Sequence, residues 1–441
     1  MKTRLSLVIS SILTGLLFSL TPAPLHADGP IQSQAIPSLA GCSIFPADNI
    51  WNTPVDTLPV DPNSAAYITN IGPNTTLHPD FGKGLWNGGP IGIPYNVVPF
   101  TQTEVAITSF LYDDESDPGP YPVPPDALIE GGPSSTGDRH VLVMRQGDCK
   151  LFEIFNAFPN GDDTWYGDSG AIFDLTSNAL RPDTWTSADA AGLPILPGLV
   201  RYDEANAGEI NHALRFTVAQ TRRDYVWPAR HFASSSTNAN RPPMGQRFRL
   251  KASFAIDGSF SPEGQAILQA LKKYGMILAD NGSNWYISGE PNELWNNDDL
   301  RDDFDRVKGS DFEAVDSSSL LVDDDSGQAQ ILGATPGAQS VNPGDVTSYV
   351  ISLLDTDSID TPLSLITSSP SPSLTLKLSA ASISPAGQVT LAVTDTHPVG
   401  PLTPGILYTL PISATGSGVT QTTTVKLLVG GTQVYLPVIV K

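Results

Sequence analysis

The 441-residue chain contains little cysteine and little positive charge. It has two cysteines, and its 24 Lys and Arg residues face 46 Asp and Glu residues, which gives a formal net charge of −22 at pH 7. Such acidity argues against binding to nucleic acids or anionic membranes, because both carry negative charge. It favours solubility and leaves a locally basic cleft open.

Several catalytic motifs are also missing. The sequence has no GxSxG, no Walker loop and no Rossmann fingerprint, which disfavours α/β serine hydrolases, kinases and dehydrogenases. It has no HExxH motif either, so no cofactor or metal is predicted. Scattered histidines leave a metal-dependent hydrolase open as an alternative; they are His78, His140, His212 and His231.

A long hydrophobic run occurs only at the N-terminus. Lys2 and Arg4 precede an apolar stretch over 5–20, and Leu25-His26-Ala27 offers a small-residue cleavage site. This pattern predicts a signal peptide over 1–27 and a secreted protein of bacterial type. Because no other segment reaches the about 20 apolar residues of a membrane span, we expect no integral membrane segment after cleavage.

The two cysteines, Cys42 and Cys149, both lie in the exported part. In an oxidising compartment an even pair most simply forms one disulfide. The bond would close a loop of just over a hundred residues and contribute roughly 4–5 kcal/mol in the chain-entropy account.

The composition changes near Ser317 and divides the chain into parts. All seven tryptophans precede it. We expect a β-rich catalytic or ligand-binding domain over 28–316, a linker rich in Ser and Asp over 317–328, and a second domain over 329–441. The fold class expected is mainly β, with a β-rich α+β first domain.

Short alternating apolar runs separated by Pro, Gly and Ser fill the second domain. They are Ser348–Leu354, Leu374–Leu378, Gln388–Val393, Ile406–Ile412 and Thr422–Val429. Such spacing is typical of a β-sandwich. The domain resembles the Ig-like modules that bacterial secreted enzymes carry behind their catalytic domains. That resemblance implies a spacer or anchoring role.

Two local patterns stand out in the first domain. Ser261 as N-cap, Pro262 at the first helical position and an apolar stripe ending before Gly275 predict a helix. Asn281-Gly282 between two strand-like runs predicts a β-hairpin.

The distribution of positive charge is uneven. Between His212 and Lys251 eight Arg or Lys residues face a single acid, Asp224. Guanidinium groups suit carboxylates, sulfates or phosphates, so this basic segment, 212–251, could bind an anionic ligand. Pairing with the protein's own carboxylates is an equally weighted interpretation.

A hairpin supplies the first pair of candidate catalytic residues. The turn at Arg145-Gln146-Gly147-Asp148 predicts that Met144 faces Cys149, which would place His140 opposite Glu153. Such a pair could be a general base with its orienting acid, two metal ligands or a half-buried ion pair.

His212 begins a second alternating run, and Glu209 lies three residues before it. A helical segment there would stack both side chains on one face. His231 follows Trp227 and Arg230, a combination typical of sugar-binding clefts. Downstream, Arg247, Arg249 and Lys251 would share one face of a strand.

These residues support four hypotheses. We prefer a secreted hydrolase that acts on an extracellular polysaccharide, and an acidic polysaccharide is one candidate substrate. Glu153, Glu209 and Asp280 are its candidate carboxylates. The alternatives are a polysaccharide lyase with His140, His212 or His231 as base, a non-catalytic carbohydrate-binding surface protein, and the metal-dependent hydrolase. Substrate binding is assigned to Arg230, His231, Arg247, Arg249, Trp165, Trp227 and Trp285. The oligomeric state stays undetermined.

Overall fold

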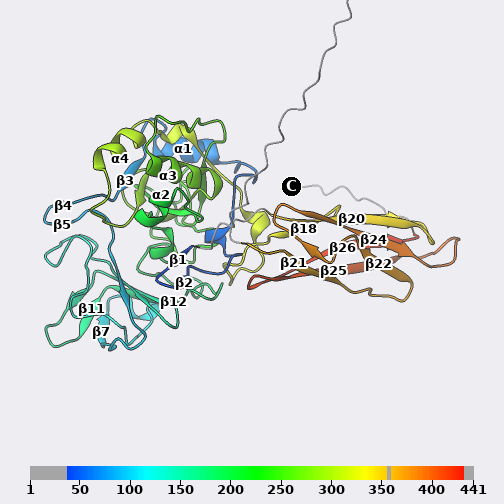
Figure 1. Cartoon of the computed structure of the whole chain (residues 1–441), viewed down its shortest axis with the longest axis horizontal. Helices are drawn as coiled ribbons and strands as arrows, with labels where there is room; N and C mark the ends of the chain where they lie inside the picture. The colour runs from blue at the N-terminus through cyan, green and yellow to red at the C-terminus, as the bar shows by residue number, and fades with distance from the viewer. Residues whose placement is uncertain (1–36, 355–358, 432–441) are drawn as a thin grey trace, which may run out of the picture. The chain divides into compact units, whose positions relative to one another are not determined.

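The computed structural model describes residues 37–354 and 359–431 (Figure 1). The predicted signal peptide over 1–27 lies outside them. Within these ranges the chain is mainly β, as the sequence predicted, with strands far outnumbering the four α-helices. None of these helices is long and apolar enough to cross a membrane.

A six-stranded sheet organises much of the first region. Its order is β17 (Phe312–Ala314), β14 (Arg247–Leu250), β15 (Met276–Asn281), β13 (Leu214–Val218), β16 (Tyr286–Ser288) and β3 (His78–Asp80). The central strands β13 and β15 run parallel. All five residues of β13 are buried, as expected for a strand in the middle of a covered sheet.

The predicted helix forms as α3 (Pro262–Lys273). The Ser261 side chain accepts a hydrogen bond from the Gly264 amide at 3.0 Å, which caps the helix. Helix α3 contacts β14 and two helices, α2 (Tyr202–Ala207) and α4 (Asn297–Phe304), and the three helices are labelled in Figure 1. The remaining helix, α1 (Ser64–Ile71), packs on β17.

The predicted hairpin at Asn281-Gly282 does not form, because β15 and β16 are not paired with each other. β13 lies between them, parallel to β15 and antiparallel to β16. The local turn signal was therefore overridden by a strand from far earlier in the sequence. Inserting β13 buries Phe216, which stacks on Trp285 with ring centroids 6.0 Å apart.

A four-stranded sheet forms the other main layer of this region. Its order is β12 (Ser169–Asp174), β9 (Lys150–Phe155), β8 (Val141–Arg145) and β6 (Tyr95–Val98). Smaller sheets join β10 (Phe158–Pro159), β11 (Trp165–Gly167) and β7 (Ile107–Phe110), β1 (Ser38–Leu39) and β2 (Cys42–Ser43), and β4 (Leu85–Trp86) and β5 (Gly89–Pro90).

The β8–β9 hairpin forms, but its register differs from the predicted one by two residues. Met144 pairs with Leu151, so Leu142 rather than His140 lies opposite Glu153. The turn extends through Cys149, whose φ of +51° belongs to a turn rather than a strand. Cys149 also forms the predicted disulfide with Cys42.

The second region contains two sheets around a hydrophobic core (Figure 1). One has the order β18 (Leu332–Thr335), β20 (Val346–Leu353), β24 (Gln388–Asp395), β22 (Leu374–Leu378). The other has the order β19 (Ala338–Val341), β26 (Val419–Val429), β25 (Ile406–Gly416), β21 (Leu363–Thr367), β23 (Ser382–Ile383). All five predicted strand runs form, because alternate apolar residues face this core.

The segment predicted as a linker, 317–328, is bonded to the first region. The Gly327 carbonyl accepts a hydrogen bond from Ile50, and the Ser326 carbonyl accepts one from the Trp227 indole at 2.7 Å. Asp325 pairs with Arg230. The Ser and Asp residues of 317–328 therefore make turns and polar contacts with the first region.

Candidate functional site

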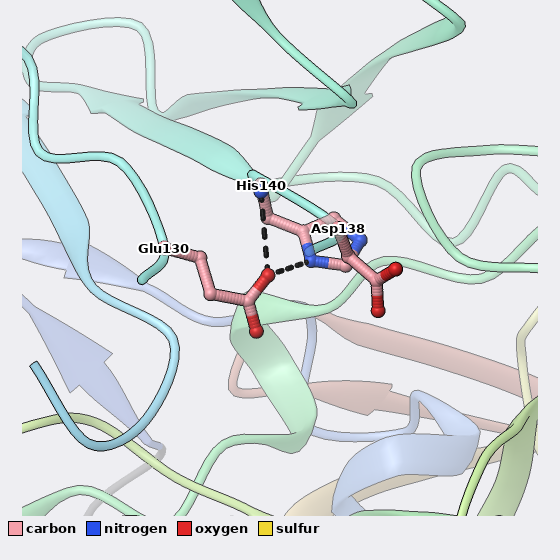
Figure 2. Close-up of side chains that lie close together, drawn as sticks. All are labelled: Glu130, Asp138 and His140. Carbon is pink, nitrogen blue, oxygen red and sulfur yellow. Dashed lines mark hydrogen bonds and ion pairs between the residues drawn. The ribbon is translucent and has the colours of Figure 1, made fainter. Parts of the chain in front are cut away.

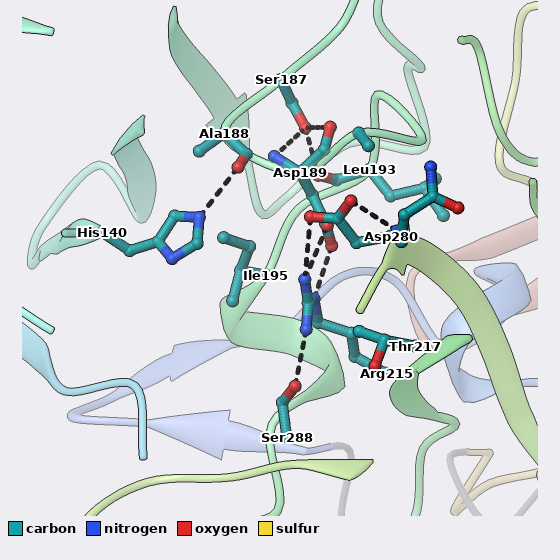
Figure 3. A network of polar contacts seen from close by, with 12 residues as sticks. His140, Ser187, Ala188, Asp189, Leu193, Ile195, Arg215, Thr217, Asp280 and Ser288 are labelled. Atoms are coloured by element: carbon teal, nitrogen blue, oxygen red, sulfur yellow. Dashed lines mark hydrogen bonds and ion pairs between the residues drawn. The ribbon is translucent and has the colours of Figure 1, made fainter. Parts of the chain in front are cut away.

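A buried ion pair lies at the centre of the six-stranded sheet. Arg215 on β13 donates to both carboxylate oxygens of Asp189, at 2.7 and 2.8 Å, and to the Ser288 hydroxyl at 2.6 Å (Figure 3). Asp189 is held in a tight loop, where its amide donates to the Ser187 hydroxyl. Burial opposes the charge of Arg215, but Asp189 outweighs it and raises the arginine's pKa.

Asp280, near the end of β15, brings a second carboxylate to Arg215. Its Oδ2 lies 3.5 Å from Arg215 Nη2 (Figure 3). Because Asp189 already forms the bidentate contact, Asp280 is only partly compensated. Burial, followed by repulsion from Asp189, raises the pKa of the Asp280 carboxyl to about 7. This acid can therefore hold a proton at neutral pH.

Asp280 opens into a cavity of about 420 Å³, which we call the Asp280 cavity. Glu115, His231, Tyr112 and Phe155 also line it. The Glu115 Oε2 atom accepts from the Thr186 amide at 2.9 Å and lies 3.9 Å from His231 Nε2. The opposite ring nitrogen of His231 contacts the Ala190 carbonyl at 2.8 Å. Two carboxyl groups, an imidazole and aromatic rings thus share one cavity.

His140 precedes β8 and is committed at both ring nitrogens. Nδ1 lies 2.6 Å from Glu130 Oε2 (Figure 2), and Nε2 lies 3.0 Å from the Ala188 carbonyl (Figure 3). Both partners are acceptors, so the ring donates from both nitrogens as an imidazolium. Burial alone would lower the pKa of His140, but the Glu130 carboxylate raises it to about 9. In this arrangement His140 is a fixed cation rather than a base.

Among the described residues, Glu130, Asp138 and His140 are the group that could hold a metal ion. One ligand atom from each lies within 4.8 Å of the others (Figure 2). A cation would have to replace the proton between His140 and Glu130, after which Nε2–H would still donate to Ala188. The chemistry of one imidazole and two carboxylates suits a divalent ion.

A second cavity has a volume of about 530 Å³ and is connected to the Asp280 cavity through the hydrogen bonds of His140. We call it the Trp86 cavity, and its lining includes His78, Asp80, Trp86, Glu130 and Tyr286. Glu130 lines this cavity and contacts His140, which contacts Ala188 in the lining of the Asp280 cavity. The charged ring of His140 therefore links one lining residue of each cavity.

Glu153, a predicted catalytic residue, lies on β9 with no solvent-exposed side-chain surface. Its carboxyl accepts from the amides of Ile195 and Leu196 at 2.9–3.0 Å. Burial raises its pKa to about 7, although these two bonds act to lower it. Glu153 lines neither cavity. Its two hydrogen bonds hold the backbone at residues 195–196.

His212 and Glu209 are not brought together. The helix ends at Ala207, and Glu209 is exposed beyond it. The partner of His212 is Glu204, with Nε2 at 3.1 Å, while Nδ1 contacts the Ala213 carbonyl. Glu204 also pairs with the fully buried Arg201. This ionic cluster is separate from both cavities.

The basic segment 212–251 mostly pairs with the protein itself. Arg215 meets Asp189, Arg222 meets Asp224, Arg230 meets Asp325 and Arg249 meets Glu313. Arg247 is buried against the carbonyls of Tyr274, Ile50 and Thr53, and burial lowers its pKa to about 9. Arg230, Arg247 and Arg249, all predicted to bind substrate, line neither cavity.

The predicted tryptophan platforms are largely internal. Trp165 and Trp285 are buried, and Trp227 is half-buried with its indole bonded to Ser326. The exposed tryptophan is Trp86, with 73% of its surface accessible. Of the predicted site residues, Asp280 and His231 share a cavity. The sequence analysis did not identify Glu115, Asp80, Glu130 and Asp189 as site residues. The exposure of Trp86 could have been predicted from the glycine-rich segment Gly82–Gly89 around it.

No family model and no curated protein matches the chain. Solved structures with similar parts include domains 4 and 5 of the S-layer protein SbsC, 16% identical over 23% of this chain and 52% of that one, with a TM-score of 0.18. The E. coli chaperone DraB is 14% identical over 23% of this chain and 54% of its own, with a TM-score of 0.19. These matches span about half of each protein's length, and at such TM-scores they support no conclusion about fold or activity.

Proposed function

We propose that the chain is an extracellular hydrolase of a polysaccharide and that the reaction occurs in the Asp280 cavity. One observation carries the proposal: Asp280, an acid with a pKa of about 7, opens into a cavity that also holds Glu115. Glycoside hydrolysis needs one carboxyl that donates a proton and a second that acts as nucleophile or base. The disulfide supports maturation in an oxidising compartment.

In this mechanism Asp280 protonates the oxygen of the leaving group. Its proton is available at neutral pH because Arg215 is already neutralised by Asp189. Glu115, held by the Thr186 amide, acts from within the same cavity as nucleophile or base. His231 positions Glu115, and the rings of Tyr112 and Phe155 offer surfaces for a sugar ring.

A neutral glycan has more support than an acidic one. No Lys or Arg lines the Asp280 cavity in the described ranges, and most arginines of the basic segment pair with the protein's own groups. A lyase acting on uronates requires a cation at the carboxylate before the neighbouring proton is removed. Hydrolysis is therefore favoured over the lyase alternative.

The test is to incubate the full chain and an Asp280→Asn variant with a panel of neutral and acidic polysaccharides. We expect wild-type protein to release reducing ends, with kcat/KM falling as pH rises through about 7 because Asp280 loses its proton. Asp280→Asn should lower kcat by about 10²–10⁴-fold with its thermal stability retained. Asp302→Asn, an exposed acid on α4, is the matched control and should retain activity.

Three results would count against the proposal. Release of unsaturated uronates would indicate a lyase. Equal activity of Asp280→Asn would remove the acid from the mechanism. Binding without any product from any polysaccharide would leave a carbohydrate-binding protein. Residues 329–441, whose described part forms two sheets, are proposed to serve as a spacer or anchoring domain that follows the catalytic domain in sequence.

A further inference from the structure

The Trp86 cavity has features that the proposed hydrolysis does not use. Trp86 lies on the β4–β5 hairpin at the rim, next to Leu85, which is 70% exposed. Such a pair of large apolar side chains on a two-residue strand has no packing role in the core. Exposed aromatic rings beside a cavity provide stacking surfaces for ligands.

The position of this hairpin is fixed rather than free. Gly89, at the start of β5, lies so close to Gly131 that a Cβ atom there would come within 2.0 Å of the Gly131 carbonyl oxygen. Only glycine permits this approach. The contact sets the Trp86 hairpin directly beside Glu130, which lines the same cavity.

A second aromatic surface comes from the edge of the six-stranded sheet. Residues 78 and 286 are neighbours on β3 and β16, and the rings of His78 and Tyr286 stack with centroids 4.0 Å apart. Asp80 follows on the same strand and also lines the cavity. The cavity thus combines aromatic rings with carboxylates.

The charge of this cavity is negative. No Lys or Arg lines it in the described part of the chain, and Glu130 is matched by His140. Among the described residues the Asp80 side chain has neither a hydrogen-bond nor an ion-pair partner, although Asp80 as a residue is exposed. The walls of the cavity raise the pKa of Asp80 by desolvation, a penalty that a bound cation would offset.

We propose that the Trp86 cavity binds a sugar ring that carries a protonated amine. The amine would be held by Asp80 and by the π faces at the rim, because aromatic rings and a carboxylate together favour an ammonium group. That the ligand is a sugar rests on the proposed function. That it carries an amine rests on the cavity itself.

The test uses monosaccharides, which need no assumption about linkage. Binding of glucosamine and galactosamine is compared with that of glucose and galactose by ligand-detected NMR and tryptophan fluorescence at neutral pH. Each pair differs at one substituent, amine or hydroxyl. We expect the amines to bind at least about tenfold more tightly, and cyclohexylamine, a ring without hydroxyls, to bind more weakly than either hexosamine.

Two variants locate the binding. Trp86→Ala should weaken hexosamine binding about tenfold, and Trp86→Phe should restore much of it. Asp80→Asn should remove the preference for amines while leaving hexose binding unchanged, and Asp302→Asn should have no effect. Because Trp86 is exposed, its replacement should not alter folding.

Equal binding of hexoses and hexosamines, or unchanged binding by Trp86→Ala, would overturn the proposal. Equal binding of cyclohexylamine would overturn the assignment to a sugar. Failure here is distinguishable from failure of the proposed function. Cleavage that depends on Asp280 without any preference for hexosamine binding rejects the amine site alone, whereas amine binding without cleavage rejects the hydrolase alone.

Discussion

At the scale of single residues, the chemistry depends on how each charge is compensated. His140 and Glu153 were predicted as partners, yet each is held by other groups: Glu130 and Ala188 for the histidine, backbone amides for the glutamate. Asp280 lacks such full compensation, because Asp189 takes the bidentate contact with Arg215. An incompletely paired acid in a cavity is a better candidate for proton transfer than a satisfied one.

The imidazolium of His140 predicts a loss of stability at alkaline pH. Its pKa rises from 6.5 to about 9 on folding, so the stabilisation is complete below 6.5 and is lost as pH rises through about 9. The loss should be about 3 kcal/mol in the free energy of unfolding. Urea denaturation across this window should show a shallower decline for His140→Gln than for wild type.

The exposed His78 supplies the control for this experiment. Burial lowers the pKa of His78, so His78→Gln should leave the alkaline decline in place. Parallel stability profiles for wild type and His140→Gln above pH 6.5 would contradict the role of His140 as a buried cation.

At the scale of elements, local signals succeeded where the element is local. Helix α3 has its N-cap and its apolar stripe within one segment, and it begins and ends where the sequence predicts. The predicted hairpin at Asn281-Gly282 does not form because β13, which comes from about sixty residues earlier, pairs with both β15 and β16. The β8–β9 register failed by two residues because Cys149 belongs to the turn.

The end of α3 provides a test of this packing. Gly275 has a φ of +65°, and an added Cβ would lie 2.1 Å from the Phe248 carbonyl oxygen on β14. Gly275→Ala should therefore lower the free energy of unfolding by about 2–4 kcal/mol. Thermal and urea denaturation would measure the change.

Gly208, at the end of α2, separates the two causes. Its φ is +83° but no atom lies within 4 Å of an added Cβ. Gly208→Ala should lose about 1 kcal/mol from backbone strain alone. If both variants lose the same free energy of unfolding, the close contact between Gly275 and β14 does not contribute to the loss.

At the scale of the whole molecule, the carboxylates of the acidic chain form ion pairs with its own basic segment. Most arginines of 212–251 are bonded to Asp189, Asp224, Asp325 and Glu313 or to carbonyls, and all four of these acids except Asp224 lie outside the segment. A local charge reversal thus served folding, and the Asp280 and Trp86 cavities are left without lysine or arginine in the described ranges.

The disulfide acts at this scale because it joins residues 107 positions apart. In the chain-entropy account its removal should lower the free energy of unfolding by roughly 4–5 kcal/mol. Replacing both cysteines with serine and measuring urea denaturation tests this value. An unchanged midpoint after replacement or reduction would show that the Cys42 segment is held by packing alone.

The sequence by itself determined the mainly β fold, the disulfide, helix α3 and the strands of the second region, because each follows from periodicity, capping or a unique pair of residues. It also pointed to Asp280 and His231. The tertiary structure alone decided that Glu115 joins them, that His140 is a fixed cation and that the basic segment pairs internally. The physical reason is that compensation of charge depends on contacts between distant segments, which leave no periodic trace in sequence.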